Sequence, residues 1–182
     1  MTHDPFKYAK LERERRFLVS PTELPGLGEE FVRFEDLYLT GTRLRLRIAS
    51  EHPGGAVLYR LTQKLQQPEA TTRRITTQYL SAPEHAVFAA LPGARLVKRR
   101  HRVLDDGLDW GVDVFEGALA GLVLAEREFD SDDALRAAAP PSFAACEVTD
   151  DVAFTGGALA TTPASETLAR AQRLLERAPK SD

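Results

Sequence analysis

Three short segments of the sequence carry basic residues at alternate positions. These residues are Arg43, Arg45 and Arg47, then Arg60 and Lys64, then Lys98, Arg100 and Arg102. Residues two apart on a β-strand share one face, so each segment would concentrate positive charge on one side of its strand. Neighbouring like charges repel each other, whereas an ordinary solvated face would mix signs. We interpret these rows as a binding surface for a polyanion.

Acidic residues show the same spacing. Glu12 and Glu14 form one pair, and Glu126 and Glu128 form another. Asp113 alternates with the apolar residues of a further segment. Carboxylate oxygens are the ligands that magnesium and manganese prefer. The acidic pairs therefore indicate a divalent cation beside the polyanion.

The elements that would position these residues are short strands. Period-2 alternation recurs in eight runs, which are residues 11–19, 32–39, 43–48, 57–65, 72–80, 96–104, 108–115 and 122–129. Asp106 and Gly107, between two such runs, are a strong hairpin signal. Helical patterns are few, at 82–91, 131–139 and 162–177, and 144–149 could add a short ninth strand. The lone pair Gly156 and Gly157 is expected in a turn.

This pattern predicts a mainly β (α+β) fold, an eight-stranded antiparallel closed β-barrel with a few peripheral helices. Closure leaves no exposed strand edge, and it would turn the charged faces inward. With 182 residues, of which 43% are hydrophobic, the chain suits one domain over 1–182. Within it we expect the barrel at 10–160 and a C-terminal helix at 161–178. That helix would pack on the barrel or form the surface of a possible homodimer.

Composition bears on partners and compartment. The 24 Lys and Arg nearly balance the 27 Asp and Glu, giving a net charge of −3, which argues against a nucleic-acid partner. Cys146 is the single cysteine, so no internal disulfide can form. No apolar run is long enough for a membrane helix, and the first ten residues lack an apolar signal core. We expect a cytoplasmic protein with no membrane partner.

Taken together, these charged motifs resemble those of a known family. Glu12, Glu14 and Arg16 resemble the ExExK signature that opens CYTH domains, the triphosphate tunnel metalloenzymes. The similarity continues in the family's order over about residues 10–160. Its further motifs contain Tyr38, Arg45 and Arg47, Lys64, Lys98 and Arg100, Asp113 and Gly117, Glu126 and Glu128, and Glu147 to Asp151.

The resemblance implies a tunnel that binds a small triphosphate with Mg²⁺ or Mn²⁺. The family includes inorganic tripolyphosphatases, thiamine triphosphatases and class IV adenylate cyclases. Matched residue by residue, it implies metal ligands at Glu12, Glu14, Glu126, Glu128 and Asp113, and a catalytic centre of Glu12, Glu14 and Lys64. With the strand pattern, it also implies substrate-binding residues at Arg16, Arg43, Arg45, Arg47, Lys64, Arg74, Lys98 and Arg100.

Two positions depart from the family's pattern. Arg16 stands where the signature has lysine, which keeps the charge but replaces a titratable amine with a planar guanidinium. The run 72–80 has no acidic residue, and its expected inward residues are Arg74, Thr76 and Gln78. We therefore expect one tightly bound metal ion.

The main prediction is metal-dependent hydrolysis of a triphosphate, either tripolyphosphate or a small organic or nucleoside triphosphate. One alternative is a non-catalytic protein that binds polyphosphate or an organophosphate. A second is an adenylate cyclase on the same scaffold. A lipocalin-like barrel for apolar ligands is disfavoured, since its inward face would be apolar.

Overall fold

The computed structural model describes residues 7–24, 26–66 and 72–178. Its strands are β1 (Lys10–Leu18), β2 (Phe31–Leu39), β3 (Leu44–His52), β4 (Val57–Gln66), β5 (Thr72–Leu80), β6 (Gly93–Asp105), β7 (Leu108–Phe115), β8 (Val123–Glu128) and β9 (Cys146–Glu147). Its helices are α1 (Ala82–Ala89), α2 (Asp132–Ala137), α3 (Gly156–Thr161) and α4 (Ala164–Arg177), with single 3-10 turns at Gly117–Leu119 and Val152–Phe154.

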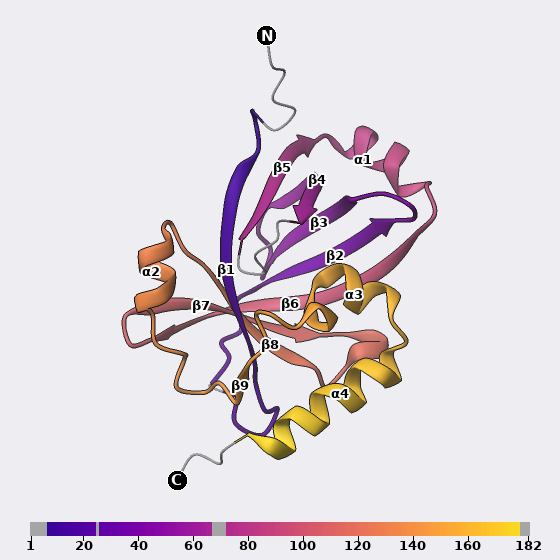
Figure 1. Cartoon of the computed structure of the whole chain (residues 1–182). Helices are drawn as coiled ribbons and strands as arrows, with labels where there is room; N and C mark the ends of the chain where they lie inside the picture. Colours follow the sequence, from indigo (N-terminus) through magenta and orange to yellow (C-terminus); the bar gives the residue numbers. More distant parts are fainter. Residues whose placement is uncertain (1–6, 25, 67–71, 179–182) are drawn as a thin grey trace.

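The sheet closes through β1. In the described part of the chain, antiparallel pairing runs in the order β5-β4-β3-β2-β6-β7-β8-β1, and β1 also pairs with β5. The first half of β1, up to Arg13, pairs with β5, and the second half, from Glu14, pairs with β8 (Figure 1). The short β9 adds to the far end of β1. The predicted eight-stranded closed barrel is confirmed.

Local sequence explains the connections. Asp106 and Gly107 join β6 to β7 with φ values of 46° and 73°, the left-handed backbone that a two-residue hairpin of type I′ requires. Ser81 begins α1 with a capping box, because its side chain accepts from the Glu84 N–H while the Glu84 carboxylate accepts from the Ser81 N–H. Both turns fix where the neighbouring strands begin and end.

The inward faces of β1, β6, β7 and β8 change character along the strands. The charged residues Arg16, Lys98, Asp113 and Glu126 are followed two positions away by Leu18, Leu96, Phe115 and Leu124. These four apolar residues are buried in one cluster, and α4 packs against it through the buried Ala171. An apolar floor therefore lies beneath the charged part of the barrel.

A second apolar cluster covers the outside of the barrel. Trp110 is 1% exposed and meets Phe17 edge to face, with ring centroids 5.5 Å apart. Leu135 of α2 packs against the same cluster.

No helix within the described ranges is long and apolar enough to cross a membrane.

The helix α3 was not predicted, because Gly156 and Gly157 each cost helix stability relative to alanine. Two features offset this cost. The Thr155 side chain accepts from the Ala158 N–H at the N-terminus of the helix, and Leu159 is buried against the apolar floor. Tertiary packing thus overrides the weak local propensity, and the prediction of a turn was wrong.

Candidate active site

A cavity of about 680 Å³ lies inside the barrel. Most of the site residues predicted from the sequence line it. They are Glu12, Glu14, Arg16, Arg43, Arg45, Arg47, Lys64, Lys98, Arg100, Glu126 and Glu128. These side chains face the cavity, so an anion entering it would approach both the basic and the acidic residues.

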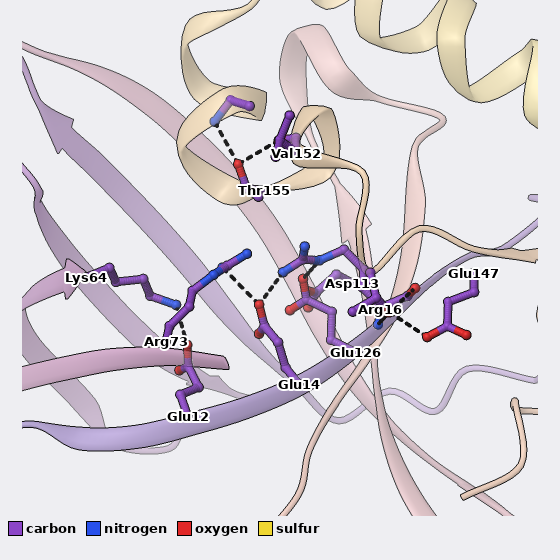
Figure 2. Close-up of polar contacts among 12 residues, drawn as sticks. Glu12, Glu14, Arg16, Lys64, Arg73, Asp113, Glu126, Glu147, Val152 and Thr155 are labelled. Atoms are coloured by element: carbon purple, nitrogen blue, oxygen red, sulfur yellow. Dashed lines mark hydrogen bonds and ion pairs between the residues drawn. The ribbon is translucent and has the colours of Figure 1, made fainter. Parts of the chain in front are cut away.

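Glu12 and Glu14 are held by cations of β4, β5 and β1 itself (Figure 2). Lys64 Nζ lies 2.9 Å from Glu12 Oε2. Arg16 and Arg73 both reach Glu14 Oε1, at 2.6 and 2.9 Å. Burial alone would raise the pKa of Glu12, but the positive charges of Lys64, Arg45 and Arg73 outweigh it and hold that pKa below its ordinary value.

Glu128 lies across β1–β8 from Glu14, with which it is directly paired. Partial burial and the negative charges of Glu12 and Glu14 raise the pKa of Glu128. As the side chains stand, no three carboxylate, histidine or cysteine groups of the described residues are arranged as a metal-ligand set. The donor chemistry of Glu12, Glu14 and Glu128 nevertheless fits a hard divalent cation, whose charge would relieve their repulsion.

A dense ion-pair network surrounds Glu126. Arg16 Nε donates to Glu126 Oε1 at 2.7 Å, and Arg100 donates to Glu126 Oε2. Asp113 is 0% exposed and accepts from Lys98 and, through both oxygens at 2.6 Å, from Arg100. Since its oxygens bind the protein's own cations and it does not line the cavity, we leave Asp113 out of the proposed cation site.

Asp36 is a site residue that the sequence analysis did not identify. Both of its oxygens accept from Arg47, each at 2.6 Å, and Asp36 is 3% exposed. Arg45 lies further away, with its Nε 3.9 Å from Asp36 Oδ1. In the sequence, Asp36 is marked only by sharing a strand face with Phe34 and Tyr38. Asp36 neutralises Arg47 and leaves most of the positive charge of Arg45 free for a ligand.

The predicted register of β5 was wrong by one residue. Arg73, Ile75, Thr77 and Tyr79 line the cavity, and Arg73 is the direct partner of the inward-facing Glu12. The expected residues Arg74, Thr76 and Gln78 therefore lie on the outer face. Both faces of β5 are polar, so alternation alone could not fix which one points inward.

The basic row predicted on β6 extends one residue too far toward the end of the strand. Arg102 has the expected parity, but it forms an ion pair with Asp109 in which the two side chains are 80% and 52% exposed. They belong to the end of the β6–β7 hairpin, outside the cavity. The prediction of Arg102 as part of the polyanion surface was wrong.

The N-terminus of α3 forms part of the cavity wall beside Tyr38. Thr155, Gly156 and Gly157 line the cavity together with Tyr38. A Cβ added at Gly156 would lie 2.0 Å from Tyr38 Oη, so only glycine allows this approach. Burial, and to a lesser degree Asp36, raise the pKa of Tyr38 to about 12. At neutral pH this ring is therefore an uncharged phenol beside the N-terminus of α3.

Comparison with known proteins places this cavity in a family. No family model matches the chain. The inorganic triphosphatase of Nitrosomonas europaea is 32% identical over 152 residues, which cover 82% of this chain and 96% of that protein.

Two solved structures are also similar to the chain. The crystal structure of the inorganic triphosphatase NE1496 has a TM-score of 0.55 at 30% identity, covering 82% of this chain and 97% of that one. A structure described as the hypothetical protein NE1496 has a TM-score of 0.57 at 31% identity, covering 84% and 99%. With its closed antiparallel barrel and inward charged rows, the chain belongs to the CYTH family of triphosphate tunnel metalloenzymes.

Proposed function

We propose that this protein hydrolyses inorganic tripolyphosphate inside the barrel, with Mg²⁺ or Mn²⁺ as cofactor. The supporting observation is that carboxylates and a larger number of basic side chains line one cavity. Lys64, Arg45 and Arg47 line the wall formed by β3 and β4, and the carboxylates of β1 and β8 line another part of the same cavity. The similarity to a protein named inorganic triphosphatase over 96% of that protein's length supports the same activity here.

Hydrolysis of a phosphoanhydride depends mainly on positioning and on stabilisation of the charge that develops on the transferred group. The guanidinium groups of Arg45 and Arg100 and the ammonium of Lys98 would bind the phosphate oxygens. Guanidinium matches phosphate geometry with paired N–H donors. Because Asp113 and Glu126 partly neutralise Lys98 and Arg100, Arg45 has the larger share of free charge.

The divalent cation would be held by Glu12, Glu14 and Glu128, with Glu126 as a further carboxylate beside Arg16. Such a cation polarises phosphoryl oxygens and lowers the pKa of bound water. The chain's own residues keep these carboxylates in place, since Arg16 and Arg73 orient Glu14. Burial and Arg45 lower the pKa of Lys64, although Glu12 acts in the opposite direction. Lys64 is therefore suited to hold or release a proton beside Glu12.

The test is phosphate release from tripolyphosphate, ATP and thiamine triphosphate, each with Mg²⁺, with Mn²⁺ and with EDTA. We expect turnover of tripolyphosphate that requires the cation. The double variant Glu12→Gln/Glu14→Gln should lower kcat/KM by at least about 100-fold, since it removes the charge of two carboxylate ligands proposed for the cation. The exposed Glu23→Gln is the matched control, and it should behave as the wild-type protein does.

The outcomes of these assays distinguish hydrolysis from the two alternative functions. Unchanged activity in the double variant would contradict the proposed centre. Tight binding of tripolyphosphate without turnover under any of these conditions would instead identify a non-catalytic polyphosphate-binding protein. Release of cyclic AMP from ATP would identify a cyclase.

A further inference from the structure

Arg60 is a charged residue of the cavity wall to which the function above gives no role. It lies on β4, directly paired with Arg47 of β3, and it lines the cavity. Its Nε is buried without a hydrogen-bond partner among the described residues. The nearby carboxylate, Asp36, has both oxygens engaged by Arg47. Arg60 thus lies beside two other arginines, and Asp36, already bound by Arg47, offsets this repulsion only in part.

This arrangement is costly for the folded protein. Burial and the positive charges of Arg47 and Arg45 lower the pKa of Arg60. An arginine whose buried Nε has no hydrogen-bond partner among the described residues, and which lies beside two other arginines, is expected of a ligand-binding residue rather than of a structural one.

The position of Arg60 relative to the other cations indicates what it would bind. Thr62 separates Arg60 from Lys64 on the inward face of β4, and Arg45 is paired directly with Thr62. Lys64, Arg45 and Arg60 therefore follow one another along the wall. The Cα atoms of Lys64 and Arg60, four residues apart on a strand, are separated by about 13 Å.

The two ends of this row have different neighbours. The charges that act on Lys64 include Glu12 and Glu14, whereas those that act on Arg60 are Arg47, Arg45 and Asp36, together with Tyr79. A linear anion lying along the row would have one end near the carboxylates and the other at Arg60.

We propose that Arg60 and Arg45 form a subsite for the terminal phosphate group that lies farthest from Glu12 and Glu14. This inference rests on the proposed function and adds to it a residue that senses chain length. A diphosphate between Lys64 and Arg45 would not need Arg60. A triphosphate would gain one more charged contact, so the subsite would favour tripolyphosphate over pyrophosphate.

The experiment measures binding of tripolyphosphate and of pyrophosphate by calorimetry in EDTA, where no hydrolysis is needed. The variants are Arg60→Gln, Arg60→Lys and, as control, the exposed Arg102→Gln. Arg60→Gln should weaken tripolyphosphate binding about tenfold or more, the effect of losing a charge-assisted contact. Pyrophosphate binding should change by less than about twofold, Arg60→Lys should recover part of the loss, and Arg102→Gln should change neither.

Thermal unfolding of the same variants separates binding from folding. Because Arg60 faces like charges, Arg60→Gln should have a melting temperature equal to or above that of the wild type while it binds tripolyphosphate more weakly. Equal loss for both anions, or no loss for either, would overturn the subsite. If the wild type bound tripolyphosphate and Arg60→Gln did so equally well, the subsite would fail and the proposed hydrolysis would stand. If the wild type neither bound nor hydrolysed tripolyphosphate, both proposals would fail.

Discussion

Glu14 of β1 and Glu128 of β8 lie directly opposite each other across an antiparallel strand pair. Like charges at such positions destabilise a sheet by up to about 1 kcal/mol. Arg16 and Arg73 both bind Glu14 through a single oxygen, yet the pKa of Glu128 remains raised by its partial burial and by Glu12 and Glu14. The barrel keeps this unfavourable pair where a cation would remove the repulsion.

Glu128→Gln should therefore stabilise the metal-free protein at neutral pH. A carboxyl group whose pKa is raised on folding binds its proton more tightly in the folded state, so its ionisation costs stability as the pH rises from the unfolded value of about 4.5 through the higher folded value. The variant should match the wild type near pH 4 and exceed it by up to about 1 kcal/mol at pH 8. Urea unfolding in EDTA across this range measures the difference.

Urea unfolding of the wild type and Glu128→Gln in Mn²⁺ tests the opposite effect, which is stabilisation by a bound cation. The wild type should gain stability from bound cation, and Glu128→Gln should gain less, so the order of stability at pH 8 should reverse. Exposed Glu23→Gln serves as the control. A Glu128→Gln protein that is less stable than the wild type in EDTA at pH 8 would contradict this account.

Arg16→Lys tests what the guanidinium contributes at the signature position. Arg16 is 3% exposed and donates from two different nitrogens, Nε to Glu126 and Nη2 to Glu14. A lysine ammonium is a point donor and cannot reproduce this fork. Because charge-assisted hydrogen bonds each contribute about 1.5–3 kcal/mol, we expect a loss of that order in the free energy of unfolding. Arg102→Lys is the surface control, and equal stability of Arg16→Lys and the wild type would refute the bridging role.

Strand alternation was sufficient to predict the barrel and most of its lining. In β3 the two strand faces are distinct, since Arg45 and Arg47 lie on one and Leu46 on the other. The concentration of like charge predicted the first as the ligand-binding face, and this face does line the cavity. On β5 both parities are polar, so sequence could not choose between Arg73 and Arg74. The Arg73–Glu14 contact depends on a register that only barrel closure sets.

Other features could not be predicted because they depend on which strands become neighbours. Asp36 gains its importance from Arg47, which only the pairing of β2 with β3 places beside it. The helix α3 depends on the buried Leu159 and on the Thr155 cap rather than on helix propensity. Both are consequences of tertiary structure.

The pair formed by Asp36 and Arg47 should be the strongest polar determinant of stability in the cavity. Asp36→Asn would leave the buried Arg47 without its partner, which costs about 3–5 kcal/mol. Burial acts to raise the pKa of Asp36, but Arg47 and Arg45 outweigh it and keep that pKa lowered. The stabilisation is therefore present above the unfolded value and is lost as the pH falls through the folded one.

Acid and urea unfolding of a double-mutant cycle would measure this coupling. Asp36→Asn should unfold at higher pH than the wild type does, and Arg47→Met in the Asp36→Asn background should restore part of the lost stability. Strictly additive effects of the two substitutions would show that the pair is not coupled.

The contact between Tyr38 and Gly156 should determine where α3 sits. At Gly156 a Cβ would meet Tyr38 Oη at 2.0 Å, whereas at Gly157 the nearest Tyr38 atom would lie at 3.8 Å, an ordinary contact. Gly156→Ala should therefore destabilise the protein by about 1–3 kcal/mol through overpacking, and Gly157→Ala, the matched control, should change stability little. In Gly156→Ala/Tyr38→Phe the clashing hydroxyl is gone and the next nearest ring atom is 3.1 Å away, so stability should partly return. Thermal unfolding of the four proteins, including Tyr38→Phe alone, measures this, and a Gly156→Ala protein as stable as Gly157→Ala would show that Tyr38 does not fix α3 against the cavity.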